Sequence, residues 1–267
     1  MSSILRCVFL LLAFGAAPLA QASPLSIVTF GDSTTAPRAL PDGSPLATYS
    51  DLLRQELPSL LGRPVSVHNA GVGGNTTVHA VARLQQDVLS HDPDFVIVQF
   101  GVNDAFVVNG SSTPQLPMSA YVANMQTIVD GIRSIGAEPI LMSPAPLSYL
   151  VWFTAWEYAP YHDRIHENAL NQQYAAALSM LAKQYSVTYV DAAAAYYAYW
   201  GGEASRLEDL HLDYVHPNAA GHRLEADLLE EAFADLLAVP EPASVWTAGV
   251  ALVALCVMLR VCRRSSR

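Results

Sequence analysis

The segment Ile27–Thr35, with the sequence IVTFGDSTT, decides the fold of this chain. It starts with a short, uninterrupted run of apolar and β-branched residues, which is typical of a strand buried on both faces of a parallel sheet. Gly31 predicts a sharp turn directly after the strand. Ser33 is therefore expected at the carboxyl edge of the sheet, where open α/β folds bind their ligands. A helix cap is the alternative, because residues 32–34 are of types that satisfy free backbone N–H groups.

Short apolar runs alternate with longer amphipathic segments along the rest of the chain. Strands are predicted at Leu25–Phe30, Val65–Asn69, Phe95–Phe100, Pro139–Met142 and Val187–Val190. Helices are predicted near Tyr49–Leu61, Val78–Leu89, Ala120–Ile135, Arg164–Tyr185 and Ala219–Leu237, with a proline-bearing loop before the first of them. This alternation predicts an α/β fold, a doubly wound three-layer α/β/α sandwich around a central parallel sheet.

The first 22 residues have the pattern of a secretory signal peptide. Arg6 precedes an apolar stretch, and Ala20-Gln21-Ala22 has small residues where a cleavage site needs them. The mature chain is expected to start at Ser23, and residues 23–238 are expected to form one domain. An uncleaved membrane anchor is the alternative, but the apolar stretch is short for one and Pro18 interrupts it.

Residues 239–267 form a second segment that is set apart from the domain. Pro240-Glu241-Pro242 is followed by a mostly apolar run and by four arginines at the end of the chain. The run from Val245 to Leu259 has 15 residues. A helix that spans a bilayer needs ~20 residues, so a transmembrane segment here would have to include residues on either side of this run. The basic end is expected to stay in the cytoplasm.

This tail resembles the PEP-CTERM sorting signal of Gram-negative bacteria. The resemblance implies that an exosortase recognises the tail and removes it, in species that typically make exopolysaccharide. The chain is therefore expected to be secreted or held in the cell envelope, initially anchored by its C-terminal segment. A plain membrane anchor is the alternative, and it would also leave the domain outside the cytoplasmic membrane.

The composition of the domain excludes several kinds of chemistry and partner. All three cysteines, Cys7, Cys256 and Cys262, fall in the two end segments. The domain therefore has no cysteine nucleophile, disulfide or cysteine metal site. Five of the 14 basic residues and one of the 24 acidic residues lie in the end segments, which leaves the domain with a net charge of −14. Nucleic acid is a poor partner for such a surface.

Residues suited to acyl transfer by a serine follow the predicted strands. This reaction needs a base that takes the serine proton, a carboxylate that orients the base, and donors for the developing oxyanion. Asp213 and His216 are three residues apart, a spacing that lets the carboxylate accept the Nδ1–H of His216 while Nε2 faces Ser33. The backbone N–H groups of Ser33 and Gly74 and the side-chain amide of Asn103 are the natural oxyanion donors.

Two other roles for the residues around His216 stay open. Asp209 and His211 form a rival pair of carboxylate and base, although no helix start follows them as it follows His216. His211, Asp213, His216 and His222 also lie close enough in sequence to suggest a metal site. The His-Glu-x-x-His pattern of many zinc enzymes is missing from the chain.

Four short motifs resemble the four blocks of the SGNH, or GDSL, hydrolase superfamily, in the same order along the chain. They are Gly-Asp-Ser at 31–33, Asn-Ala-Gly-Val-Gly-Gly-Asn-Thr at 69–76, Gly-Val-Asn-Asp at 101–104 and Asp-Tyr-Val-His at 213–216. The resemblance covers residues 25–237 in outline and implies a flavodoxin-like α/β/α fold. Thr34 is a departure, since the lipase-like members often have leucine there, and it weakens any inference of a lipid substrate.

The resemblance also implies a role for each site residue. Ser33 is implied as the nucleophile, His216 as the base and Asp213 as the carboxylate that orients it. The N–H of Ser33, Gly74 and Asn103 are implied as the oxyanion hole. No cofactor and no metal are expected.

The expected function is that of a secreted carboxylic-ester hydrolase that forms an acyl-serine intermediate. Its substrate class depends partly on aromatic rings, which suit stacking on sugars, an acyl groove, or plain core or lid packing. These rings are Tyr149, Trp152, Phe153, Trp156, Tyr158, Tyr161, Tyr196, Tyr197, Tyr199 and Trp200. The tail favours an O-acetylated carbohydrate, because it is typical of bacteria that make exopolysaccharide.

Several other functions stay open as alternatives. They are a lipase- or lysophospholipase-type acylhydrolase, an arylesterase, a polysaccharide O-acetyltransferase and a non-catalytic matrix protein. An acid–base glycosidase built on Asp32 and Asp213 is a further one, but it would leave Gly74 and Asn103 without a role.

Overall fold

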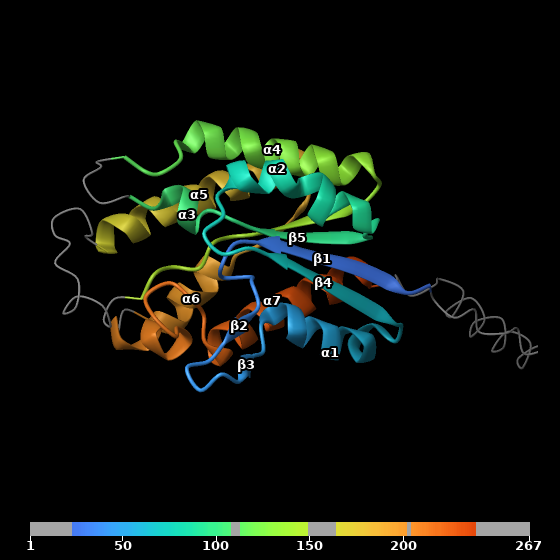
Figure 1. Ribbon diagram of the computed structural model, residues 1–267, viewed down its shortest axis with the longest axis horizontal. Helices are drawn as coiled ribbons and strands as arrows, with labels where there is room; N and C mark the ends of the chain where they lie inside the picture. The colour runs from blue at the N-terminus through green and yellow to red at the C-terminus, as the bar shows by residue number, and fades with distance from the viewer. Residues whose placement is uncertain (1–22, 108–112, 149–163, 202–203, 239–267) are drawn as a thin grey trace, which may run out of the picture.

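The computed structural model describes residues 23–107, 113–148, 164–201 and 204–238 of the 267-residue chain (Figure 1). The predicted signal peptide, the predicted sorting segment and the rings from Tyr149 to Tyr161 lie outside these residues. Among the described helices, none is both long enough and apolar enough to cross a membrane.

A five-stranded parallel sheet forms the centre of the described chain. Its strands are β1 (Leu25–Gly31), β4 (Val65–Gly71), β5 (Phe95–Gln99), β6 (Glu138–Met142) and β7 (Thr188–Val190). They lie in the order β4-β1-β5-β6-β7, and every neighbouring pair is parallel. The chain runs from β1 to β4 on one side and then back past β1 to β5 on the other, so the switch point at which doubly wound folds bind ligands lies between the ends of β1 and β5.

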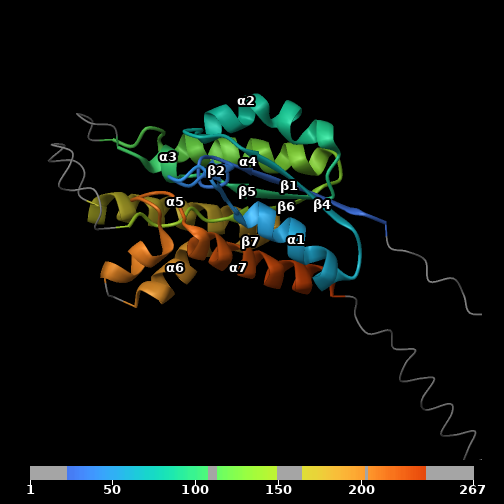
Figure 2. The same cartoon turned by 60° about the horizontal axis from the view of Figure 1, so that its bottom comes forward.

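Helices cover both faces of this sheet (Figures 1 and 2). One face carries α1 (Tyr49–Leu61), α6 (Ala192–Trp200) and α7 (Ala219–Leu237), and the other carries α2 (Thr77–Asp87), α4 (Met118–Ser134) and α5 (Arg164–Tyr185). The short helix α3 (Val102–Ala105) follows β5. The predicted α/β/α sandwich is confirmed.

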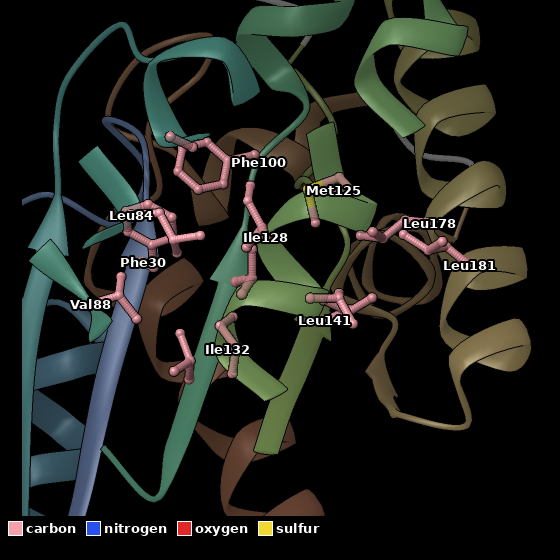
Figure 3. Close-up of a cluster of buried hydrophobic side chains, with 14 of the residues drawn as sticks. Phe30, Leu84, Val88, Phe100, Met125, Ile128, Ile132, Leu141, Leu178 and Leu181 are labelled. Atoms are coloured by element: carbon pink, nitrogen blue, oxygen red, sulfur yellow. The ribbon is translucent and has the colours of Figure 1, made fainter. Parts of the chain in front are cut away.

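Alternate residues of β1 enter two different hydrophobic cores. Val28 and Phe30 belong to the core under α2, α4 and α5, whereas Leu25 and Ile27 belong to the core under α1 and α7. Figure 3 shows the first core, where side chains from three helices meet those of the sheet. Both faces of β1 are therefore apolar, which explains why its sequence does not alternate with polar residues.

Some short elements differ from the sequence-based expectation. The predicted proline-bearing loop contains the antiparallel pair β2 (Arg38–Ala39) and β3 (Pro45–Leu46). Two-residue strands are too short to show a period in sequence. The sequence of α6, AAAAYYAYW, likewise has no apolar stripe, and this helix was not predicted. Two 3₁₀ helices complete the described elements, η1 (Leu89–His91) and η2 (Ala204–Leu210).

Gly31 is required by close packing as well as by the turn that was predicted from it. A Cβ atom at this position would lie 2.0 Å from Oγ1 of Thr35 and 2.9 Å from the carbonyl oxygen of Gln99. The turn itself is closed by the N–H of Ala36, which donates to the carbonyl oxygen of Asp32 at 3.0 Å. Only glycine leaves room for this turn to fold back onto β5.

Candidate active site

A chain of hydrogen bonds joins Ser33, His216 and Asp213 at the carboxyl end of β1. Oγ of Ser33 lies 3.0 Å from Nε2 of His216, although the two residues are 183 positions apart in sequence. On the far side of the ring, Nδ1 of His216 lies 2.7 Å from Oδ2 of Asp213. All three residues are partly exposed. The structure thus brings together the residues predicted as nucleophile, base and orienting carboxylate, in the order that serine acyl transfer needs.

Asp213 is held in its ionised form by the turn in which it lies. Its Oδ1 accepts the backbone N–H groups of Val215 and His216, both at 2.8 Å. Burial opposes ionisation, but these two bonds and the bond from the His216 ring outweigh it and lower the pKa of Asp213 to about 2. A carboxylate that stays charged keeps the Nδ1–H of His216 pointing at it, which leaves Nε2 free to accept a proton from Ser33.

The start of α7 fixes the position of this turn. Asn218 caps the helix, since its Oδ1 accepts the N–H groups of Ala220 at 2.8 Å and Gly221 at 3.1 Å. On the other side of the turn, the N–H of Leu212 donates to the carbonyl oxygen of His216 at 2.8 Å. His216 therefore lies between a closed loop and a capped helix, and its backbone has little freedom.

Asp32 and Thr34 face the interior and build the turn that presents Ser33. Oδ1 of Asp32 accepts both the N–H and the Oγ1–H of Thr34 at 2.9 Å. Asp32 is 1% exposed, and its burial raises its pKa to about 6 against the opposing effect of these bonds. A glycosidase role for Asp32 is not supported, because the carboxyl group does not reach the surface. Thr34 is also buried, so its side chain does not bear directly on the substrate.

The loop after β4, which contains Gly74, approaches the nucleophile at Gly73. A Cβ atom on the neighbouring Gly73 would lie 3.8 Å from Cβ of Ser33, so the two turns are in contact. Gly74 has a φ of +75°, and a Cβ atom there would meet nothing within 4 Å. Glycine at 74 is therefore explained by its left-handed backbone.

Asn103 stands at the start of α3, and its amide reaches across to the same loop. Nδ2 donates to the carbonyl oxygen of Asn75 at 3.1 Å, which uses one of its two hydrogens and leaves the second for another acceptor. The next residue, Asp104, is fully buried, and its Oδ1 accepts the N–H of Thr77 at 3.0 Å. Burial raises the pKa of Asp104 in spite of this bond. These contacts tie the segment of Asn103 to the start of α2.

His211 is held by the protein rather than presented to a substrate. Its Nδ1 lies 2.6 Å from the carbonyl oxygen of Leu207 and its Nε2 lies 2.9 Å from that of Pro146. Burial lowers the pKa of His211. Both ring nitrogens face backbone carbonyl oxygens, so the structure does not support the rival pair of Asp209 and His211. Nowhere in the described ranges do three His, Cys, Asp or Glu side chains gather in a way that would hold a metal ion.

A pocket of about 170 Å³ opens beside Asn103. Its lining is mostly apolar and includes Phe106, Leu147 and Val215, the last from the turn that carries His216. Asn171 of α5 also lines it and is 4% exposed, and among the described residues its Nδ2 has no hydrogen-bond partner. Sequence reasoning missed Asn171. Its signal in the sequence is a polar amide at a position of α5 where the helix turns apolar residues toward the sheet.

Of the rings that were candidates for stacking on sugars, those that the structure describes belong to α6, and they mainly pack within the protein. Tyr196 is fully buried, and its ring centre lies 5.4 Å from that of His211. Tyr197 and Trp200 contact each other edge to face at 5.8 Å. Tyr199 is 36% exposed and lies under the guanidinium of Arg206 at 4.7 Å. Core packing thus accounts for Tyr196, which was one of the candidate sugar-stacking rings.

Relatives of this chain include named esterases at low identity. It is 25% identical to an acetylxylan esterase of Geobacillus stearothermophilus over 75% of this chain and 90% of that protein. It is 28% identical to an arylesterase of Vibrio mimicus over 52% of this chain and 64% of that protein. The first relative, a lipoprotein of Bacillus subtilis, is 26% identical over 48% of this chain and 54% of its own length. Two of these three alignments thus span less than two thirds of the relative.

A solved structure and a family model also match this chain. The solved structure of Axe2, an acetylxylan esterase from G. stearothermophilus, matches with a TM-score of 0.62 and 21% identity, over 81% of this chain and 95% of that one. The model of the GDSL-like Lipase/Acylhydrolase family matches residues 29–224. This match runs from β1 into α7 and includes all the residues of the candidate site, so the chain belongs to the GDSL-like lipase/acylhydrolase family.

Proposed function

We propose that this protein is a serine esterase that cleaves carboxylic esters through an acyl-serine intermediate. The observation that carries the proposal is the contact of Ser33 Oγ with Nε2 of His216 at 3.0 Å, with Asp213 2.7 Å from the other ring nitrogen. This arrangement gives the serine a base, and it gives the base a fixed tautomer. Membership of a lipase/acylhydrolase family supports the same reaction class.

In the first half of the reaction, His216 Nε2 takes the proton of Ser33 while Oγ attacks the carbonyl carbon of the ester. The electron pair of the C=O bond moves onto the carbonyl oxygen, and the N–H groups of Ser33 and Gly74 and the amide of Asn103 stabilise it. When the tetrahedral intermediate collapses, the bond to the alcohol oxygen breaks. His216 then gives its proton to the leaving alcohol, and the acyl group stays on Ser33.

In the second half, a water molecule loses a proton to Nε2 of His216 and attacks the acyl carbon. A second tetrahedral intermediate forms and is stabilised by the same donors. Its collapse breaks the bond to Oγ, releases the carboxylic acid and returns the proton to Ser33. Asp213, whose pKa is about 2, stays ionised and holds the imidazolium that forms in each half.

We propose an O-acetylated carbohydrate as the substrate class. The pocket beside Asn103 has about 170 Å³, whereas pockets for drug-sized ligands have roughly 300–1,000 Å³. A pocket of this size suits a short acyl group better than a long fatty chain. The relative named acetylxylan esterase supports the same class.

Active-site labelling tests the reaction class. The purified protein is treated with an organophosphonate, and mass spectrometry locates the adduct, with Ser33→Ala as the control. We expect one adduct, on Ser33, together with hydrolysis of p-nitrophenyl acetate by the wild-type protein. An adduct on another residue would overturn the mechanism. No adduct and no hydrolysis would favour a non-catalytic matrix protein.

Substrate comparison tests the acyl and alcohol parts separately. The kcat/KM for p-nitrophenyl acetate is expected to exceed that for the decanoate ester by at least about tenfold, since a ten-carbon chain overfills the pocket. Acetate release from an acetylated polysaccharide is then measured with and without a free sugar acceptor. Faster decanoate cleavage would favour a lipase-type enzyme. Transfer to the sugar that outpaces acetate release would favour an O-acetyltransferase.

We also propose that residues 1–22 export the domain and that residues 239–267 hold it in the envelope until an exosortase removes them. The support is the sequence pattern of the two segments, Arg6 before an apolar stretch at one end and Pro-Glu-Pro before an apolar run and arginines at the other. N- and C-terminal sequencing of the protein from fractions of an exosortase-bearing host tests this. A product that starts at Met1 in the cytoplasmic fraction would contradict it.

A further inference from the structure

Arg83 lies on α2 and contacts two of the three segments that carry the proposed oxyanion donors, those of Ser33 and Gly74. It belongs to none of the four sequence motifs. Its Nη2 donates to the carbonyl oxygen of Gly31 at 2.7 Å, and its Nη1 donates to the carbonyl oxygen of Ala70 at 2.7 Å. Its Nε donates to Oδ1 of Asn75 at 2.8 Å. One guanidinium thus holds the end of β1, the end of β4 and the loop between β4 and α2.

These contacts lead directly to the donors. Gly31 is two residues before Ser33, and Asn75 follows Gly74. The backbone carbonyl oxygen of Asn75 accepts the Nδ2–H of Asn103 at 3.1 Å. Arg83 therefore orients Asn75 through its side chain, and Asn75 orients the Asn103 amide through its backbone.

The guanidinium is itself held rigidly. It lies over the ring of Phe30, 4.4 Å from the ring centre, and its Nη1 also pairs with Oδ2 of Asp87 at 2.9 Å. The side chain of Arg83 is 15% exposed. A planar fork with five N–H donors can satisfy these partners at the same time, whereas the ammonium of lysine has three hydrogens on one atom.

We propose that Arg83 is a positioning residue of the oxyanion hole, which fixes the N–H groups of Ser33 and Gly74 and the amide of Asn103 relative to one another. The inference rests on the proposed esterase function. A preorganised oxyanion hole acts mainly in the transition state, and a displacement of about 1 Å costs on the order of 10²-fold in rate. Loss of Arg83 therefore lowers kcat and leaves KM nearly unchanged.

Arg54 provides a matched control because it makes the same kind of contact away from the site. Its Nε and Nη2 donate to the carbonyl oxygen of Val67 in β4, at 3.1 and 2.9 Å, and its Nη1 pairs with Asp51. Arg54→Lys thus removes arginine bonds to the same strand without touching the proposed oxyanion segments. Its kcat is expected to stay within about twofold of wild type.

The test compares Arg83→Lys, Arg83→Ala and Arg54→Lys in the full chain. We expect kcat on p-nitrophenyl acetate to fall about 10²-fold in both Arg83 variants, with KM within about threefold. The affinity for a trifluoromethyl ketone, which adds to Ser33 and places an oxyanion in the hole, is expected to fall in parallel. Added guanidinium ion is expected to restore part of the rate of Arg83→Ala and none of the small loss in Arg54→Lys.

A measurement that needs no activity separates this inference from the esterase proposal. The side-chain amide resonances of Asn103, followed by ¹⁵N NMR, are expected to shift in Arg83→Lys and to stay in place in Arg54→Lys. A wild-type protein without hydrolysis would end the esterase proposal, while the spectrum would still decide the positioning role. Unchanged Asn103 resonances, or Arg83 variants that lose only melting temperature and keep kcat, would overturn the inference.

Discussion

Replacing Asp213 by asparagine separates two roles of its carboxylate, which closes a turn and also orients the ring of His216. Oδ1 accepts two backbone N–H groups at 2.8 Å, and asparagine keeps an oxygen that can accept both. Oδ2, which lies 2.7 Å from Nδ1 of His216, becomes an NH₂ group that cannot accept a proton. The turn is therefore expected to survive, while His216 is driven to the tautomer that carries its proton on Nε2. That tautomer cannot take the proton of Ser33.

The size of the effect follows from the charge that develops on His216. As Ser33 attacks, the imidazole becomes an imidazolium beside the carboxylate of Asp213. Two unit charges about 4 Å apart interact by ~4 kcal/mol at the effective dielectric constant of a partly exposed site. Each 1.36 kcal/mol of barrier is about tenfold in rate, so Asp213→Asn is expected to lower kcat by about 10³. KM is expected to change by less than about threefold, because the charge on His216 develops only as the transition state is approached.

The assay is initial-rate hydrolysis of p-nitrophenyl acetate at pH 8, with Ser33→Ala setting the background. Asp209→Asn is the matched control, since Asp209 belongs to the rejected pair and its Oδ2 makes a long contact of 3.5 Å with the hydroxyl of Tyr199. That control is expected to keep nearly full activity. A kcat of Asp213→Asn within tenfold of wild type would refute the reasoning, as would a large loss in Asp209→Asn with none in Asp213→Asn.

Three further predictions concern Asn103, Asp32 and Asn171. Asn103→Ala is expected to lower kcat by about 10²–10³ with little change in KM, and an unchanged kcat in steady-state assays would remove the amide from the oxyanion hole. The pKa of Asp32 is raised from 3.8 to about 6, so folding favours its protonated form and stability should fall by roughly 2 kcal/mol as the pH rises from 4 to 6. Urea unfolding at both pH values should show this fall in the wild type and much less of it in Asp32→Asn. Asn171→Leu replaces a buried amide whose Nδ2 has no partner in the part of the chain that the structure describes, and it is expected to raise the free energy of unfolding by about 1–2 kcal/mol; denaturation that shows a loss would contradict this.

The sequence by itself determined the layers of the fold and the residues of the candidate site. A strand buried on both faces has to be apolar throughout, and an amphipathic helix has to carry its apolar residues at a period of 3.6, so both leave a local pattern. The bounds predicted for α1, α5 and α7 agree with the structure for this reason. Ser33, Asp213 and His216 were found because acyl transfer restricts the residue types that suit each role.

Only the tertiary structure decided which of these residues meet. Ser33 and His216 are 183 positions apart, and their contact depends on strand order and helix packing that no local pattern encodes. In sequence, His211 was an alternative to His216 as the catalytic base. In the structure, its two ring nitrogens face the carbonyl oxygens of Leu207 and Pro146. Arg83 was not singled out at all, because an arginine on a helix carries no sign of the strand ends it binds. Hydrogen bonds to backbone carbonyls depend on where the chain passes, and the chain's path is set by the packing of the whole domain.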